Sequence, residues 1–284
     1  MASALRNTFL YPIEGFFRLL GHSHSIYIFE ADLPKRDYYW HAPIYKKISH
    51  YISKGYAVIY ILESDALTTI RRMSKMGIEV EDYVESGVLT IISNDIFYSP
   101  HVTGPTMIEQ WHKLFSNIEK KNGKPKGFVA MGMPTSSFFT SPSHLEHLVE
   151  YESAVAQKYD GSIDAICCYT TESMSHMPLK HIIRLLNTHQ NTVHEDYALK
   201  RWSNSRALSI IKRSLNEALG SYGSAVLLNI LSHGHNHDCG LNEEDTVLLS
   251  PSRFEENLKK VLYSSAAESI LEKIKAEFMK DIVF

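Results

Sequence analysis

Apolar runs that alternate with helical patterns constrain the fold of this sequence more than any other feature. Five runs rich in apolar and β-branched residues, at 25–32, 56–63, 87–93, 126–133 and 162–169, predict buried strands. Segments with apolar residues at helical spacing separate these runs. Buried strands joined by helices are typical of a mostly parallel sheet covered on both faces. The sequence therefore predicts a three-layer α/β domain.

The expected helices have recognisable ends. Gly55 and Gly77 follow two of them, as C-terminal glycines commonly do. Ser143 with Glu146 three residues later predicts a capping box for a third. The residues at 191–194 are expected to form a last strand at the edge of the sheet. The helices themselves are predicted at 40–54, 64–76, 107–121, 143–158 and 178–187.

A second composition begins near residue 196. Helical spacing dominates from there, with a predicted helix at 197–219 that is broken by Gly220 and Gly223. Further helices are expected at 224–231, 252–262 and 266–279. We therefore predict two domains, an α/β domain at 1–195 and an all-α domain at 196–284.

Charge and cysteine content restrict the partners. The formal net charge is −3, and acidic and basic residues nearly balance in the helical region, so a nucleic-acid partner is not expected. No apolar run is long enough for a membrane span, and the first twenty residues carry charges that a signal peptide would lack. Three cysteines form no disulfide framework, which suits a reducing cytoplasm. We expect a cytoplasmic protein with no membrane contact.

The segment after the first run argues against ordinary nucleotide binding. A phosphate-binding loop needs glycines, and a lysine followed by serine or threonine. Residues 32–40 contain no glycine, and Lys35 and Arg36 offer charge without that geometry. No nucleophile lies at an interpretable spacing from a base. We therefore expect no ATP site here and no enzymatic activity.

A series of short segments along the first two thirds of the chain carries a family resemblance: 24–30, 55–61, 76–80, 87–89, Tyr98, 132–133, 151–152, 166–169 and His189. In their order and spacing these segments resemble the MEDS domain, a sensory domain of methanogen and methylotroph regulators. The resemblance implies a RecA/KaiC-like fold without a phosphate loop, and small organic ligands such as hydrocarbon derivatives. The helical region is similar to the output domains of archaeal sensors. This sequence departs from the family at two places, and both departures remove negative charge from the expected pocket. The family often has an acidic residue within the segment 130–133, and an aspartate where this chain has Thr170.

Candidate ligand-binding residues follow from the expected sheet. Ligands of open α/β sheets bind outside the carboxyl ends of the strands. Each candidate also has an ordinary structural explanation: Glu30 and Glu63 as helix caps or solvated groups, Met133 as core filler, Tyr98 as a loop anchor. His24 with Glu152 could equally be a structural pair that orients the first strand. The candidates are His24, Glu30, Glu63, Tyr98, Met133, Glu152 and Tyr169.

One polar segment carries metal-ligand chemistry. His233, His235, His237 and Cys239 lie within seven residues, and imidazole and thiolate bind zinc and other transition metals. The spacing matches no standard zinc motif, so a solvated loop explains the segment equally. Cys167 and Cys168 are interpreted as small buried strand residues. Apart from this segment, no cofactor is expected.

Three functional hypotheses remain open. The first is a sensor whose α/β domain binds a small molecule and whose helical domain relays the change to a protein partner or to a second copy. The second is a divergent nucleotide-dependent hydrolase or transferase that uses Glu30 or Glu63 as base or metal ligand. The third is a protein-interaction module without a ligand.

Overall fold

Two compact units make up the chain. The computed structural model describes residues 24–29, 41–62, 66–94, 98, 100–158, 163–189, 191–194, 200–201, 204–232 and 251–283. One unit, here the α/β unit, consists of Met1–His176 and Thr188–Lys200. The other, the helical unit, consists of Met177–Asn187 and Arg201–Phe284. The helical unit thus includes a segment from inside the predicted first domain.

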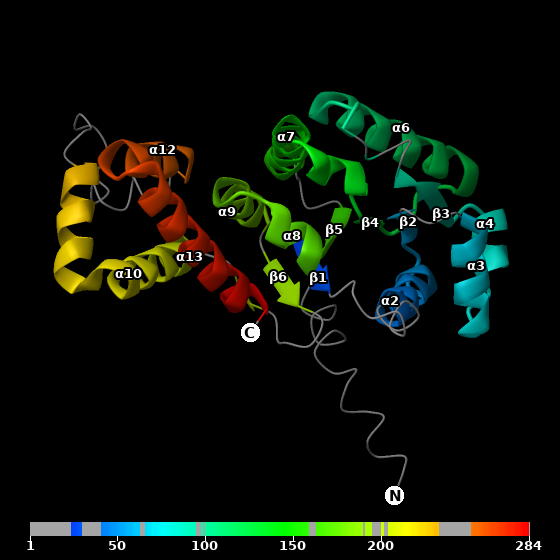
Figure 1. The fold of residues 1–284 in the computed structure, drawn as a ribbon. Helices are drawn as coiled ribbons and strands as arrows, with labels where there is room; N and C mark the ends of the chain where they lie inside the picture. Colours follow the sequence, from blue (N-terminus) through cyan, green and yellow to red (C-terminus); the bar gives the residue numbers. More distant parts are fainter. Residues whose placement is uncertain are drawn as a thin grey trace, which may run out of the picture. The chain divides into compact units, whose positions relative to one another are not determined.

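Within the described residues, seven strands form one sheet in the order β3-β2-β4-β5-β1-β6-β7 (Figure 1). The pairs β1–β5, β1–β6, β2–β3, β2–β4 and β4–β5 are all parallel, which confirms the predicted mostly parallel sheet. The segment expected at the edge, β6, instead lies between β1 and β7. The strands are β1 (His24–Phe29), β2 (Ala57–Leu62), β3 (Leu89–Ser93), β4 (Phe128–Gly132), β5 (Ile163–Thr170), β6 (Asn191–His194) and β7 (Lys200–Arg201).

Helices cover both faces of this sheet. One face packs on α2 (His41–Ser53), α3 (Ala66–Lys75) and α4 (Val80–Glu85), around a core that includes the aromatic rings of Tyr45 and Tyr60. On the other side of the sheet α6 (Gly104–Asn122) and α7 (Pro142–Lys158) pack against each other (Figure 1). All six residues of β2 are buried, which explains why its sequence is a continuous apolar run.

Several short elements were not predicted, and some helix starts differ from the predicted ones. The unpredicted elements are α4, the 3₁₀ turn η1 (Ser136–Thr140), α8 (Thr171–His176) and β7. Helix α6 begins at Gly104 rather than at 107, because the Thr103 hydroxyl accepts a hydrogen bond from the Thr106 amide. Helix α7 begins at Pro142, and the amide of His144 donates to the hydroxyl of Ser141, so Ser141 caps it rather than Ser143.

The helical unit contains α9 (Leu179–Asn187), α10 (Asn204–Ser232), α12 (Pro251–Val261) and α13 (Ser264–Val283). Helix α9 packs on α12 and α13, and α13 also packs on α10. The predicted helix at 197–219 begins only at Asn204, since Lys200–Arg201 form β7. Gly220 interrupts α10 with a φ of 72°, as expected from the sequence.

No helix among the described residues combines the length and apolar character that crossing a membrane requires.

Candidate functional site

Glu152, in the middle of α7, is the centre of a buried polar cluster. Its side chain is 0% exposed. The carboxylate atom Oε2 lies 3.2 Å from Nε2 of His24 and 3.7 Å from Nε2 of His189, and it accepts a hydrogen bond from the Cys167 thiol at 3.4 Å. The second atom, Oε1, accepts hydrogen bonds from the hydroxyls of Tyr98 and Tyr169. We call His24, Tyr98, Glu152, Cys167, Tyr169 and His189 the Glu152 cluster.

The strand order brings these residues together. Strand β1 lies between β5 and β6, so His24 at its start is paired with Ala165, two residues before Cys167. His189 lies two residues before β6, whose Asn191 is paired with Ser25. Side chains alternate along a strand, so Cys167 points to α7 while Cys168 enters the core on the opposite face. Residues far apart in sequence therefore meet under one helix.

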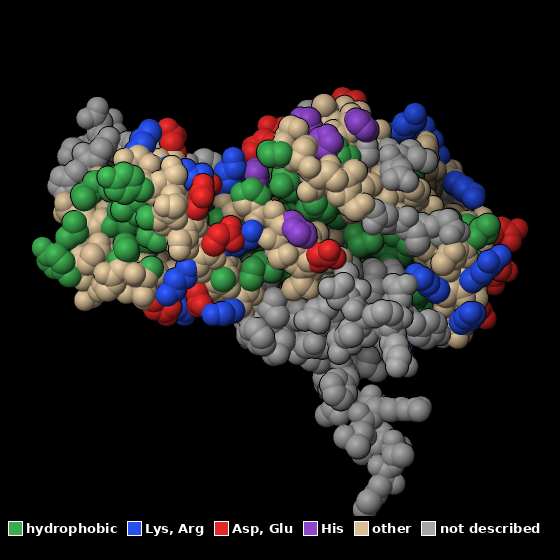
Figure 2. All heavy atoms as spheres, viewed as in Figure 1, with side chains coloured by type: hydrophobic (Ala, Val, Ile, Leu, Met, Phe, Trp, Pro, Cys, Tyr) green, Lys and Arg blue, Asp and Glu red, His purple; other side chains and the backbone are tan. Residues whose placement is uncertain are grey.

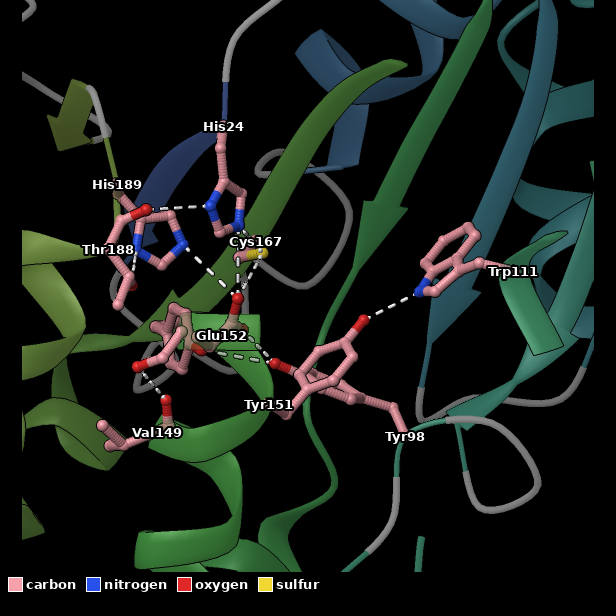
Figure 3. Close-up of polar contacts among 11 residues, drawn as sticks. His24, Tyr98, Trp111, Val149, Tyr151, Glu152, Cys167, Thr188 and His189 are labelled. Carbon is pink, nitrogen blue, oxygen red and sulfur yellow. Dashed lines mark hydrogen bonds and ion pairs between the residues drawn. The ribbon is translucent and has the colours of Figure 1, made fainter. Parts of the chain in front are cut away.

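Thr188 holds both imidazoles of the cluster. Its backbone carbonyl accepts a hydrogen bond from Nδ1 of His24 at 2.9 Å, and its hydroxyl lies 3.0 Å from Nδ1 of His189. Both Nε2 atoms consequently point to Glu152, as Figure 3 shows. The two rings lie with their centroids 4.0 Å apart.

The protonation of the cluster follows from its surroundings. Burial raises the pKa of Glu152, but the hydrogen bond from His24, the attraction of His189 and the hydrogen bond from Tyr98 outweigh it and lower the pKa from 4.5 to about 2. Burial and the nearby Glu152 carboxylate raise the pKa values of the Cys167 thiol and of the Tyr98 and Tyr169 hydroxyls. At neutral pH the centre is therefore a carboxylate surrounded by protonated donors.

A cavity of about 90 Å³ borders the Glu152 cluster. His24, Tyr98 and Cys167 form its polar side, and Trp111, Phe115 and Val155 contribute to its largely apolar wall. The wall is held in place by a hydrogen bond of 2.8 Å from the Trp111 indole to the Tyr151 hydroxyl (Figure 3). The arrangement offers an apolar space with hydrogen-bonding groups at one side, which is typical of small-molecule sites.

Four predicted ligand-binding residues meet in this cluster: His24, Tyr98, Glu152 and Tyr169. Met133 does not belong to it. Met133 lies at the carboxyl end of β4, beside a second cavity of about 350 Å³. The cluster itself lies on the face of the sheet under α7, whereas the sequence analysis expected the site at the carboxyl ends of the strands. Glu30, Glu63, His233, His235, His237 and Cys239 lie outside the described residues.

The sequence does not predict that Cys167 and His189 contact Glu152. Both cysteines have the pattern of buried strand residues, and no sequence spacing links His189 to the other members of the cluster. Strand alternation was the available signal, because adjacent residues of a strand face opposite sides of the sheet. One of two adjacent cysteines had to face α7 if the other faced the core.

Comparison with protein families identifies the chain. Residues 33–190 match the family described as the MEthanogen/methylotroph, DcmR Sensory domain, or MEDS. This match spans more than half of the sequence. The chain belongs to the MEDS family. MEDS membership supports a sensory, regulatory role, and the matched segment includes every member of the Glu152 cluster except His24.

Structural similarity adds a distant resemblance. A solved structure from a structural study of Pyrococcus horikoshii OT3 is 10% identical to this MEDS protein with a TM-score of 0.44. The similarity covers 64% of this chain and 86% of the other. A search of curated proteins gave no significant match.

Proposed function

We propose that this MEDS protein is a cytoplasmic, non-enzymatic sensor that binds a small, partly apolar molecule in the cavity beside the Glu152 cluster. The observation that carries the proposal is the cavity itself, which combines an apolar wall with His24, Tyr98 and Cys167 at one side. A cavity of about 150 Å³ holds benzene. The smaller volume here, about 90 Å³, suits an organic molecule of a few heavy atoms.

The α/β unit is proposed to have a RecA/KaiC-like arrangement without a phosphate loop. The support is the strand order, in which β1 lies inside the sheet, β5 and β6 flank it, and β4 and β2 follow beyond β5. The glycine-free segment 32–40 after β1 is the reason to expect a site unrelated to phosphate.

The proposed relay follows the backbone. The chain leaves the α/β unit after His176, forms α9 in the helical unit, and returns at Thr188. Thr188 contacts both imidazoles of the Glu152 cluster. A ligand that shifts His24 or His189 would therefore change the position of the residue that directly follows α9, which biases the helical unit between two states.

The helical unit is proposed to pass the signal on by self-association or by binding a protein partner. Tyr222, Val226 and Ile230 follow each other at helical spacing on α10, and they are 84%, 42% and 50% exposed. Figure 2 shows hydrophobic side chains gathered over this part of the helix. Exposed apolar stripes of this kind are common at protein interfaces.

Thermal-shift measurements test the ligand proposal. We expect stabilisation by short-chain alcohols or ketones graded by size, and none by ATP with Mg²⁺. Val155 lines the cavity, so the larger side chain of Val155→Phe should fill part of it and abolish the thermal stabilisation by these molecules. Gln157→Phe places the same ring at an exposed position of α7 and should leave it unchanged. Stabilisation by nucleotide, or an organic shift that survives Val155→Phe, would contradict the proposal.

A further inference from the structure

Four side chains of the Glu152 cluster present metal-ligand atoms to one common point. The Nε2 atoms of His24 and His189, Sγ of Cys167 and a carboxylate oxygen of Glu152 all lie within 4.8 Å of one another. We propose that these four residues bind a single divalent transition-metal ion, and that zinc fits them best. This inference does not depend on the organic ligand proposed above.

Three of the distances are those of a tetrahedral site. Zinc bonds of about 2.0–2.1 Å to nitrogen and oxygen and about 2.3 Å to sulfur place the ligand atoms about 3.3–3.6 Å from each other. His24 Nε2, Cys167 Sγ and Glu152 Oε2 are 3.2, 3.4 and 3.4 Å apart, which corresponds to one face of such a tetrahedron. His189 Nε2 lies 3.7 Å from the same oxygen, within a set of atoms that are at most 4.8 Å apart, and would move inward to supply the fourth corner.

The surrounding hydrogen bonds orient the ligands as metal sites require. Metal-binding histidines usually donate the other ring nitrogen to a carbonyl or hydroxyl, which fixes the ring and its tautomer. Thr188 supplies both acceptors, its carbonyl for His24 and its hydroxyl for His189. Glu152 is held in the same way, because Tyr98 and Tyr169 bind Oε1 and leave Oε2 facing the other three ligands.

The charge of the donor set favours a divalent ion. A thiolate, a carboxylate and two neutral imidazoles carry two negative charges, which a divalent cation neutralises. This balance matters because the site is buried, and burial of a net charge costs free energy. The ion would replace two protons that now point to Glu152, that of the Cys167 thiol and that of His24 Nε2. Mixed sulfur, nitrogen and oxygen donors suit zinc. They do not suit magnesium or calcium, because both ions prefer sites made of oxygen ligands.

Cobalt substitution is the direct test. The full chain is purified in a His235→Ala, His237→Ala, Cys239→Ser background, so that the polar segment at 233–239 does not contribute. After chelation, one equivalent of Co²⁺ should produce tetrahedral d–d bands and a thiolate-to-cobalt absorption, and Zn²⁺ should displace both. Absence of these bands at one equivalent would overturn the proposal.

Adjacent cysteines provide a matched control. Cys167→Ser should abolish the thiolate absorption, whereas Cys168→Ser, which changes a buried thiol on the opposite face of β5, should keep it. A thiolate band that persists in Cys167→Ser would assign the metal elsewhere and refute the site.

A milder variant covers the case in which Cys167→Ser does not fold. Thr188→Val removes the hydroxyl beside His189 but no ligand, so the spectrum should stay tetrahedral while the affinity for Co²⁺ falls about 10- to 100-fold. An unchanged affinity would show that Thr188 does not position a metal ligand and would count against the site.

Discussion

At the scale of single residues, Glu152 is the most consequential side chain of the α/β unit. It is a fully buried carboxylate with partners on both oxygens. Glu152→Gln removes the charge and replaces one carboxylate oxygen by an amide nitrogen, whose hydrogens face groups that now donate to that oxygen, either the two hydroxyls or the thiol. We expect a loss of about 3 kcal/mol in the free energy of unfolding, measured by chemical denaturation. Glu150→Gln, at an exposed position of the same helix, should change it by less than about 0.5 kcal/mol.

Low pH should lower the free energy of unfolding through the protonation of Glu152. The pKa of Glu152 is lowered from 4.5 to about 2 in the folded state, so its ionisation stabilises the fold above pH 4.5. This stabilisation is lost as the pH falls from about 4.5 towards 2. The difference in unfolding free energy between wild type and Glu152→Gln should therefore shrink over that interval. A difference that stays constant with pH would mean that the Glu152 charge does not stabilise the fold.

Only part of this cluster could be predicted from sequence. His24 and Glu152 were proposed as a pair, but Cys167 and His189 were not assigned to it. The four metal-ligand candidates are spread along the chain from position 24 to position 189, and no spacing rule links them. They meet because β1 lies between β5 and β6, and strand order is a property of the folded sheet.

At the scale of elements, α10 depends on one glycine. Gly220 has a φ of 72°, a conformation that other residues adopt only with strain. A Cβ at this position would meet no other atom, so the expected cost of Gly220→Ala is purely conformational, about 1–2 kcal/mol. Thermal unfolding of the two variants measures this cost. Ser221→Ala, at the next and exposed position, is the control and should have little effect in this measurement. Equal stability of the two variants would argue that α10 is continuous in solution.

The exposed stripe of α10 makes a second prediction for elements. If the helical unit self-associates through it, Tyr222→Ser combined with Ile230→Ser should lower the molar mass measured by light scattering to that of a monomer. Tyr263→Ser, at a residue that is 90% exposed but outside α10, should not change the molar mass. A monomeric wild type would contradict self-association and leave a different protein as the expected partner of this stripe.

Elements with strong periodicity were predicted well, and short ones were not. All of the continuous apolar runs became strands, because burial on both faces of a sheet selects for such runs. Helices α4 and α8 have only six residues each, too few to establish a period. Lys200 and Arg201, which were predicted within a helix at 197–219, form β7, because pairing with the sheet overrides the local helical pattern there.

At the scale of the whole molecule, the two units share the chain in alternation. It crosses between them after His176, after Asn187 and after Lys200. A fragment of residues 1–195 would keep α9 but lose α12 and α13, on which α9 packs. Ile182, Ile183 and Leu186 are buried in the full chain. We expect this fragment to aggregate when expressed, while the full chain remains dispersed in the same buffer. A well-folded, monodisperse fragment would show that α9 does not need the other helices.

The same interleaving bears on how such a protein can evolve. A sensor whose input and output are consecutive segments can acquire a new output by a single gene fusion. Here the helical unit includes α9, which is encoded between β5 and β6 of the sheet. Replacing the helical unit in one recombination event would leave α9 facing foreign helices. Changes in α9 and in residues 201–284 are therefore expected to be inherited together, and the α/β unit and the helical unit to diversify as one.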